Sequence, residues 1–193
     1  MKNFATFVVW ALLLVVAGAE PFDFTPRASS YLCEDIVFHN IKFKQGSMDV
    51  TYDPPRNWEC SGGGEHGYIR PQDRGSSIRG EMLHFDNTPP IKLDEDGYKA
   101  LKTMAATYVP GKPEDVQLLS EDRSAVNIYT HPAVEYTFSC KIFGLPSKVC
   151  VVISPIQREQ FVFVLRGDAK EFDDAQLSFV KSLYSLTWRK PTN

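Results

Sequence analysis

The sequence predicts an α+β fold: a single domain built on an antiparallel β-sheet, with one helix inserted midway and a second near the end. Two patterns support this prediction. Residues 133–143 alternate apolar and polar side chains, as a half-buried strand does. Residues 93–109 and 168–185 instead place apolar side chains three or four positions apart, as amphipathic helices do. The length of 193 residues suits one hydrophobic core.

Short strands separated by turns are expected in the first half of this domain. The strands predicted there are 36–43, 48–52, 68–70 and 81–85. The second must end at Pro54-Pro55, because proline rings remove donors from the strand ladder. We expect Trp58 to fill the core at that strand end. The glycine run within 61–67 predicts a hairpin loop, since no helical pattern follows it and no phosphate-binding GxxxxGK[ST] motif is present.

A helix and longer strands are expected in the second half. Asp94, Glu95 and Asp96 supply the cap and the negative charge that favour a helix start before residues 93–109 turn apolar on one face. The strands predicted after this helix are 116–119, 125–129, 133–143, 149–155 and 160–166. Residues 161–165 contain no polar break, which predicts a central strand covered on both faces.

The first nineteen residues predict a secretory signal peptide. Lys2 precedes an apolar stretch from Phe4 to Val16, and Ala17-Gly18-Ala19 supplies the small residues that a signal peptidase reads. The apolar stretch is shorter than the roughly 20 residues that a membrane span needs. We therefore expect cleavage after Ala19 and an exported protein, periplasmic or secreted, with no transmembrane segment left. The expected division into signal peptide, N-terminal leader and α+β domain falls at residues 1–19, 20–34 and 35–190. The leader is expected to be mobile or to lie along the surface, because residues 20–30 contain two prolines and no sustained period.

Four cysteines lie in the part that would be exported: Cys33, Cys60, Cys140 and Cys150. An even count in an oxidising compartment predicts disulfide bonds, and three connectivities are open. Residues 144–147 predict a turn that would bring two strands back side by side, which favours Cys140 with Cys150 and Cys33 with Cys60. Buried free thiols are the alternative. No Cys-x-x-Cys occurs, so neither a redox motif nor a zinc site is predicted.

Three features resemble the PsbP-like family, which includes the photosystem extrinsic protein, Ran-binding proteins of the Mog type and exported bacterial relatives. An early strand runs into a tyrosine, prolines and a tryptophan at 52–58, the last strand of a long meander is aromatic and β-branched at 161–165, and the final helix closes with Phe179 to Tyr184. The resemblance covers residues 36–188. It implies an α-β-α sandwich that binds a partner or stabilises an assembly, and it implies no photosynthetic role and no metal ligands.

Neither the composition nor the motifs indicate catalysis, metal binding or nucleic-acid binding. The net charge of −3 gives no footprint for nucleic acid. The histidines, with no pair at metal-ligand spacing, are His39, His66, His84 and His131. The acidic runs 94–96 and 121–122 lack the spacing of a calcium loop, and no GxSxG elbow occurs. We therefore predict no catalytic residue, no cofactor and no bound metal.

These expectations combine into one prediction of function with two alternatives. The chain is expected to be an exported, non-enzymatic interaction or assembly-stabilising module that docks on an envelope or secreted protein through a sheet edge or loop face. Tyr68, Tyr129 and Tyr184 are candidates for exposed groove residues. The first alternative is a carrier of a small apolar ligand, and the second is a hydrolase assembled from dispersed histidines and acidic residues. Partner identity and oligomeric state stay open.

Overall fold

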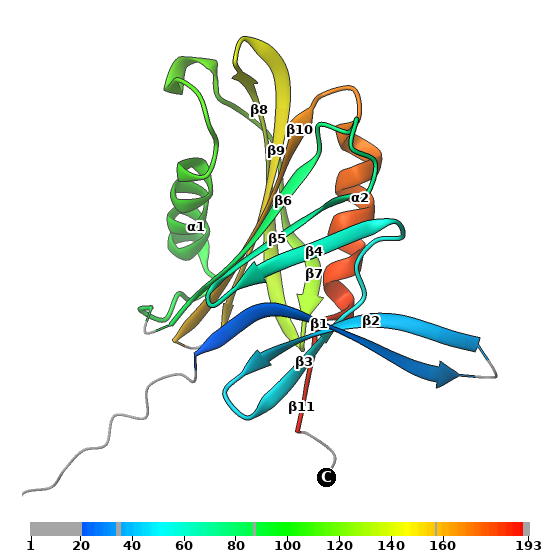
Figure 1. Cartoon of the computed structure of the whole chain (residues 1–193). Coiled ribbons are helices and arrows are strands. Elements are labelled where there is room, and N and C mark those ends of the chain that lie inside the picture. Colours follow the sequence, from blue (N-terminus) through cyan, green and yellow to red (C-terminus); the bar gives the residue numbers. More distant parts are fainter. Residues whose placement is uncertain (1–20, 34–35, 87, 157, 191–193) are drawn as a thin grey trace, which may run out of the picture.

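Two antiparallel sheets form the framework of the protein (Figure 1). The structure, a computed structural model, describes residues 21–33, 36–86, 88–156 and 158–190, and gives only the backbone for residues 31–33, 36–38 and 113. One sheet has seven strands in the order β4-β5-β6-β10-β9-β8-β7, and the other has four in the order β1-β2-β3-β11. The predicted signal peptide and its cleavage site at Ala19 lie outside the described residues.

The elements follow one another along the chain with short connections. The seven-stranded sheet consists of β4 (Trp58–Gly63), β5 (His66–Pro71), β6 (Arg79–Phe85), β7 (Gln117–Ile128), β8 (His131–Ile142), β9 (Leu145–Ile156) and β10 (Glu159–Asp168). The four-stranded sheet consists of β1 (Phe22–Cys33), β2 (Ile36–Gln45), β3 (Met48–Tyr52) and β11 (Thr187–Arg189). The helices are α1 (Glu95–Thr107), α2 (Phe172–Ser182) and the 3₁₀ turns η1 (Pro113–Asp115) and η2 (Leu183–Ser185).

The predicted fold class is wrong. The protein is mostly β, and two short helices accompany two antiparallel sheets where helical layers on both faces of one sheet were expected. The error arose because several strands carry weak alternation: residues 117–128 form one continuous strand, β7, whose polar middle was predicted to be a break. Register shifts beside Ser120 and Val126 accommodate that irregular sequence.

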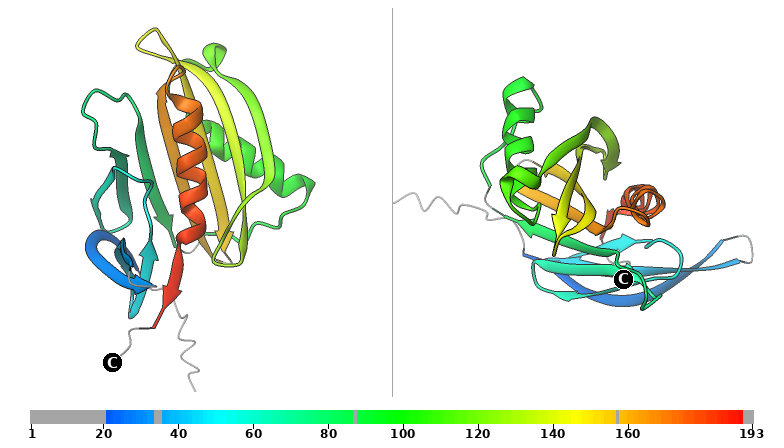
Figure 2. Two further views of the ribbon diagram at one scale, coloured as in Figure 1. Left: turned by 90° about the vertical axis from the view of Figure 1, so that its right-hand side faces the viewer. Right: turned by 90° about the horizontal axis from the view of Figure 1, so that it is seen from above.

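Opposite faces of the seven-stranded sheet are covered by different elements (Figure 2). On one face, α1 buries Leu101 and Ala105 among apolar residues of β8, β9 and β10. On the other face, α2 and the four-stranded sheet share a larger core that includes Phe172 and Phe179. An apolar cluster on each face of the central sheet is thereby removed from water, which is the main source of stability in such a fold.

Strand β10 and helix α1 confirm two predictions made from the sequence. Residues 160–165 of β10 are buried on both faces, because β10 lies between β6 and β9 in the middle of the sheet. The α1 cap is also the expected one, since the Asp94 carboxylate accepts a hydrogen bond from the Gly97 N–H at 3.0 Å. Trp58, expected in the core, is half-buried and stacks on Phe179 with a centroid separation of 6.3 Å.

The segment predicted to be a leader, residues 20–34, forms strand β1 over Phe22–Cys33. Phe22 and Phe24 are buried in the core shared by the two sheets, and a shift in the β1–β2 register between Asp23 and Arg27 accommodates Pro26. The domain therefore begins earlier than residue 35, and the two prolines that suggested an unstructured leader lie at the start of an edge strand and at its bulge.

A chain of polar side chains crosses the junction between the two sheets. The Trp188 indole N–H donates to Gln45 Oε1 at 2.6 Å, and Gln45 Nε2 donates to Glu159 Oε2 at 2.8 Å. His84 is 1% exposed, and its Nε2 lies 3.5 Å from the same carboxylate oxygen. The contact is electrostatic, because this distance is longer than that of a normal hydrogen bond. Burial raises the pKa of Glu159, but His84 and Gln45 together outweigh burial, so the pKa lies below its usual value.

The cysteines do not form the predicted bonds. Cys60, Cys140 and Cys150 are free thiols, and the side chain of Cys33 is not described. Cys140 packs in the core beneath α1, whereas Cys150 packs in the core on the opposite face of the sheet. Cys140 pairs in register with Ser147, and Cys150 pairs with Thr137, so their side chains cannot meet.

Because these three thiols are free, the thermal stability of the protein is expected not to depend on reductant. In a Cys33→Ser variant, which removes the one cysteine whose side chain is not described, the Tm is expected to be the same with and without dithiothreitol. Loss of a native disulfide would cost about 2 to 5 kcal/mol and lower the Tm by several degrees. A reductant-dependent fall in the Tm of this variant would show that two of the other three cysteines are bonded.

The Glu159 carboxylate predicts a pH dependence of stability. Its folded-state pKa lies below the value of 4.5 expected for an unfolded chain, so its contribution is fully present above about pH 4.5 and is lost as the pH falls through the folded-state pKa. The difference in unfolding free energy between the wild type and Glu159→Gln should therefore shrink on acidification. Urea unfolding of both proteins between about pH 7 and pH 3 measures it, and a pH-independent difference would contradict the assignment.

Candidate functional site

A pocket opens at the end of the sheet face that α1 leaves uncovered. Helix α1 has 13 residues and rises about 1.5 Å per residue, whereas β8 and β9 each have 12 residues at about 3.3 Å per residue. The helix is therefore about half as long as the strands beneath it. Figure 1 shows the β8–β9 hairpin extending past the end of α1. The depression at this hairpin has a volume of about 450 Å³. A separate depression on the outer face of the four-stranded sheet has a volume of about 480 Å³.

The loop that closes the hairpin has a backbone conformation that few residue types adopt without strain. Ile142 and Leu145 are paired, so the loop contains two residues, Phe143 and Gly144, with φ of +51° and +82°. Positive φ at both positions defines a type I′ turn, in which asparagine and glycine are the favoured residues. A phenylalanine at the first position is strained, and strain of this kind is retained where the surroundings or the function require it.

The side chains at this tip project into solvent. Phe143 is 102% exposed and Leu145 is 63% exposed. They form the apolar wall of the hairpin pocket together with Pro110 and Ile142. Large apolar side chains exposed together are uncommon on a protein that has no partner, because each keeps unfavourable contact with water.

Two arginines also line the hairpin pocket. Arg79 of β6 and Arg166 of β10 are directly opposite each other in the sheet register, and both line the pocket. Arg79 Nη1 donates to the carbonyls of Ser76 and Ile78 at 2.8 and 2.6 Å, and Arg166 Nη2 donates to Glu81 Oε1 at 2.7 Å. Both guanidinium groups are thus held in place, and like charges directly opposite in a sheet disfavour each other.

The remaining lining of the hairpin pocket is polar. Ser77, Ser147, Gly167 and Asp168 complete it. The Asp168 carboxylate accepts a hydrogen bond from the Lys170 N–H at 2.8 Å, and Ser77 Oγ accepts one from the Asp168 N–H at 2.9 Å. The arrangement is an amphipathic pocket, in which apolar side chains face fixed cations.

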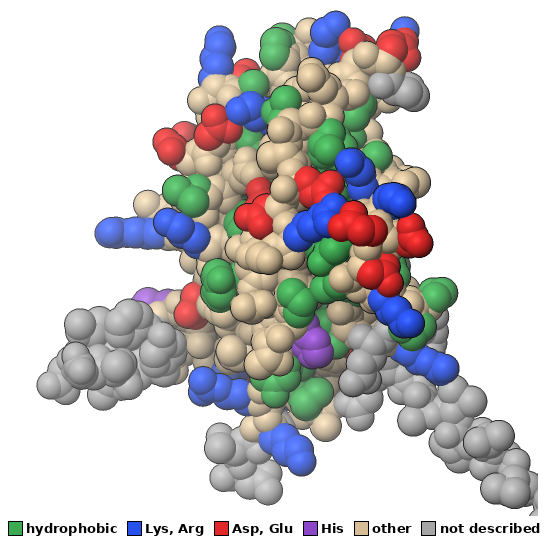
Figure 3. Space-filling model, turned by 180° about the vertical axis from the view of Figure 1, so that it is seen from behind, with side chains coloured by type: hydrophobic (Ala, Val, Ile, Leu, Met, Phe, Trp, Pro, Cys, Tyr) green, Lys and Arg blue, Asp and Glu red, His purple; other side chains and the backbone are tan. Residues whose placement is uncertain are grey.

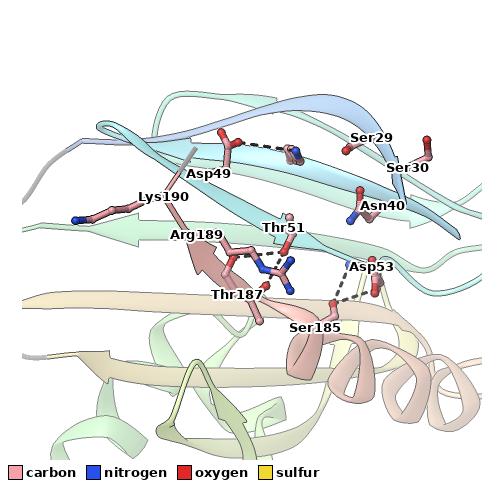
Figure 4. A pocket seen from close by; sticks show the side chains of 11 residues that line it. Ser29, Ser30, Asn40, Asp49, Thr51, Asp53, Ser185, Thr187, Arg189 and Lys190 are labelled. Atoms are coloured by element: carbon pink, nitrogen blue, oxygen red, sulfur yellow. Dashed lines mark hydrogen bonds and ion pairs between the residues drawn. The ribbon is translucent and has the colours of Figure 1, made fainter. Parts of the chain in front are cut away.

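A second depression lies on the outer face of the four-stranded sheet and is polar throughout (Figure 4). Asp49 contacts Lys42 at 3.8 Å and Lys44, which lies outside the lining, at 2.5 Å, and the hydroxyls of Thr51 and Thr187 are 2.6 Å apart. Burial raises the pKa of the Asp53 carboxyl group. Because all of its lining residues are polar and none offers an apolar side chain on which a partner could pack, this polar groove is the weaker candidate.

The far side of the molecule offers no large apolar surface. Figure 3 shows acidic and basic side chains together over the middle of that face, with hydrophobic side chains scattered singly between them. Many charged side chains of the protein belong to ion pairs, such as Arg123 with Glu95 and Lys102 with Glu121. In the described part of the chain, no helix combines the length and apolar character required to cross a membrane.

The histidines singled out in the sequence are not brought together. His39 and His66 are exposed, His131 is half-buried, and His84 is buried against Phe22 and Phe161. His84 contacts carboxylates, but its ring lines neither depression. Among the residues that the structure describes, no group of three histidine, cysteine or acidic side chains could hold a metal ion.

The tyrosines proposed as groove residues are exposed but separate. Tyr68, Tyr129 and Tyr184 are about half exposed, and none lines either depression. Sequence reasoning missed Phe143, Arg79 and Arg166. One signal was available, since Phe143 stands beside Gly144 where two strongly predicted strands must reverse. The arginines carry no such signal, because only the strand register places them opposite each other.

Comparison with known proteins does not identify a family. No known protein family and no characterised protein matches the sequence. One similar structure is a protein of unknown function from Pseudomonas aeruginosa, with 12% identity and a TM-score of 0.42 over 86% of this chain and 99% of that one. Another, from Bacteroides thetaiotaomicron, has 13% identity and a TM-score of 0.42 over 73% of this chain and 45% of that one. The resemblance to the PsbP-like family stays a prediction.

Proposed function

We propose that the protein is an exported, non-enzymatic interaction module that docks on an envelope or secreted protein through the β8–β9 hairpin. The observation that carries this proposal is Phe143, which is wholly exposed on a strained backbone and has Leu145 beside it. The export part of the proposal rests on the signal-peptide pattern of residues 1–19.

A comparison within the protein supports a binding role for Phe143. Tyr129 occupies the same first position of the β7–β8 turn, with φ of +46°, and Thr130 follows at +72°. The Tyr129 ring packs against Trp188 with a centroid separation of 5.2 Å, so its position is explained by contacts within the fold. Phe143 has no comparable contact, and a partner would supply one.

The alternatives receive less support from the structure. A carrier of an apolar ligand would offer an enclosed apolar cavity, but the aromatic side chains fill the core between the two sheets and both depressions open to solvent. A hydrolase would place a histidine and a carboxylate in a cleft, but His84 lies beneath the surface, away from both depressions.

Docking through the hairpin predicts a selective loss of binding. Peptides selected from a phage-displayed library on the full mature protein should bind wild type and lose most of their affinity for Phe143→Asn. The matched control is Tyr129→Asn, which makes the same change at the equivalent turn position and should leave binding unchanged. Peptides that bind wild type and Phe143→Asn equally well would refute docking at this tip.

The same variant predicts a gain in stability. Asparagine adopts positive φ more readily than phenylalanine, and a strained residue of this type costs of order 1 kcal/mol. Because Phe143 buries no surface, its removal sacrifices no packing. Phe143→Asn should therefore raise the unfolding free energy by about 1 kcal/mol in urea titrations, and a loss of stability would mean that Phe143 packs within the folded chain.

A further inference from the structure

We infer that the hairpin pocket binds a partner segment in which an apolar side chain lies next to a carboxylate side chain. The apolar side chain would pack on the wall that holds Phe143 and Leu145, and the carboxylate would lie between Arg79 and Arg166. This inference rests on the proposed function and adds the chemistry of the partner.

The two arginines supply unused hydrogen-bond donors. Among the described residues, the Arg79 guanidinium donates through Nη1 alone, which leaves its Nε–Nη2 edge without an acceptor. Arg166 donates through Nη2 alone, which leaves Nε and Nη1 without one. An edge with two parallel N–H groups matches the two oxygens of a carboxylate, and such charge-assisted pairs are the strongest hydrogen bonds in proteins.

The guanidinium groups are also preorganised for an anion. Backbone carbonyls fix Arg79, and Glu81 fixes Arg166, so little side-chain entropy is lost on binding. The sheet register makes the two cations neighbours; Glu81 pairs with Arg166, whereas Arg79 has no carboxylate partner among the described residues, and a bound carboxylate would supply one. Asp168 and Glu81 are the nearby acids, and each already accepts a hydrogen bond from this chain.

The shape of the pocket favours a protein segment over a lipid surface. The arginines line a depression of about 450 Å³ and do not project with the hairpin tip. Nearby lysines are neutralised, Lys141 by Asp115 at 2.9 Å and Lys148 by Asp173 at 2.6 Å. A surface for anionic lipid would instead present unpaired cations around the inserted side chain.

The test measures the affinity of one synthetic peptide chosen from the library selection, and of its matched Glu→Gln or Asp→Asn form, for several variants. Selected sequences should place an acidic residue beside an apolar one. The carboxylate-to-amide change should weaken binding to wild type about tenfold or more, because it removes a charge-assisted pair. The same change should have a smaller effect on Arg79→Gln and on Arg166→Gln than on wild type, because each variant keeps only one of the two arginines that contact the carboxylate.

Arg189→Gln in the polar groove is the matched control and should behave as wild type. Arg166→Gln keeps the test valid if loss of the Arg79 contacts unfolds that variant. Peptides that need Phe143 but respond equally to the amide change in wild type and in both arginine variants would overturn this inference and leave the proposed function standing. Peptides that ignore Phe143, or binding only to vesicles of phosphatidylcholine and phosphatidylglycerol, would overturn both.

Discussion

Aromatic packing between the two sheets holds the protein together. The Phe22 ring lies 5.3 Å from that of Phe161 and 4.3 Å from that of Phe24, so the first strand is anchored directly on the central strand of the other sheet. Phe43 extends this cluster to Tyr52, with centroids 6.2 Å apart. A buried phenylalanine contributes several kcal/mol, and Phe22, Phe24, Phe43, Val50 and Tyr52 of the four-stranded sheet are buried in this shared core. The placement of β1, β2, β3 and β11 therefore depends on these rings.

The sequence predicts correctly the elements whose apolar residues follow one clear pattern. It misses strands in which prolines interrupt that pattern while a bulge preserves the pairing. The unbroken apolar run of β10, the alternation of β8 and the capped start of α1 follow from residue type alone. β1 was missed because Pro21 and Pro26 suggested a mobile segment, while a bulge lets the chain keep its pairing. Because β1 is the edge strand of the four-stranded sheet, missing it is a second reason, besides the weak alternation of β7, why the predicted fold class was wrong.

The cysteine pairing and the lining of the hairpin pocket both depend on the register of the strands, which sequence patterns define least well. The turn was placed over residues 144–147 but consists of Phe143 and Gly144. In the observed register Cys140 pairs with Ser147, and Cys150 lies on the opposite face of the sheet. Register also joins Arg79 to Arg166 across strands that are far apart in the chain. A one-residue change in pairing would send one of these arginines into the core, so the pocket could not be foreseen from spacing.

The two edges of the seven-stranded sheet bear on behaviour at high concentration. At one edge, β7 interrupts its pairing twice and presents the charged residues Glu121, Asp122 and Arg123. At the other, the turn after β4 is occupied by β1, since the Phe24 N–H donates to the Gly64 carbonyl at 2.8 Å. Irregular, charged or occupied edges resist pairing with a strand of another molecule. Both edges of the sheet therefore disfavour edge-to-edge aggregation. Apolar side chains are instead exposed at the hairpin tip, which is not an edge strand.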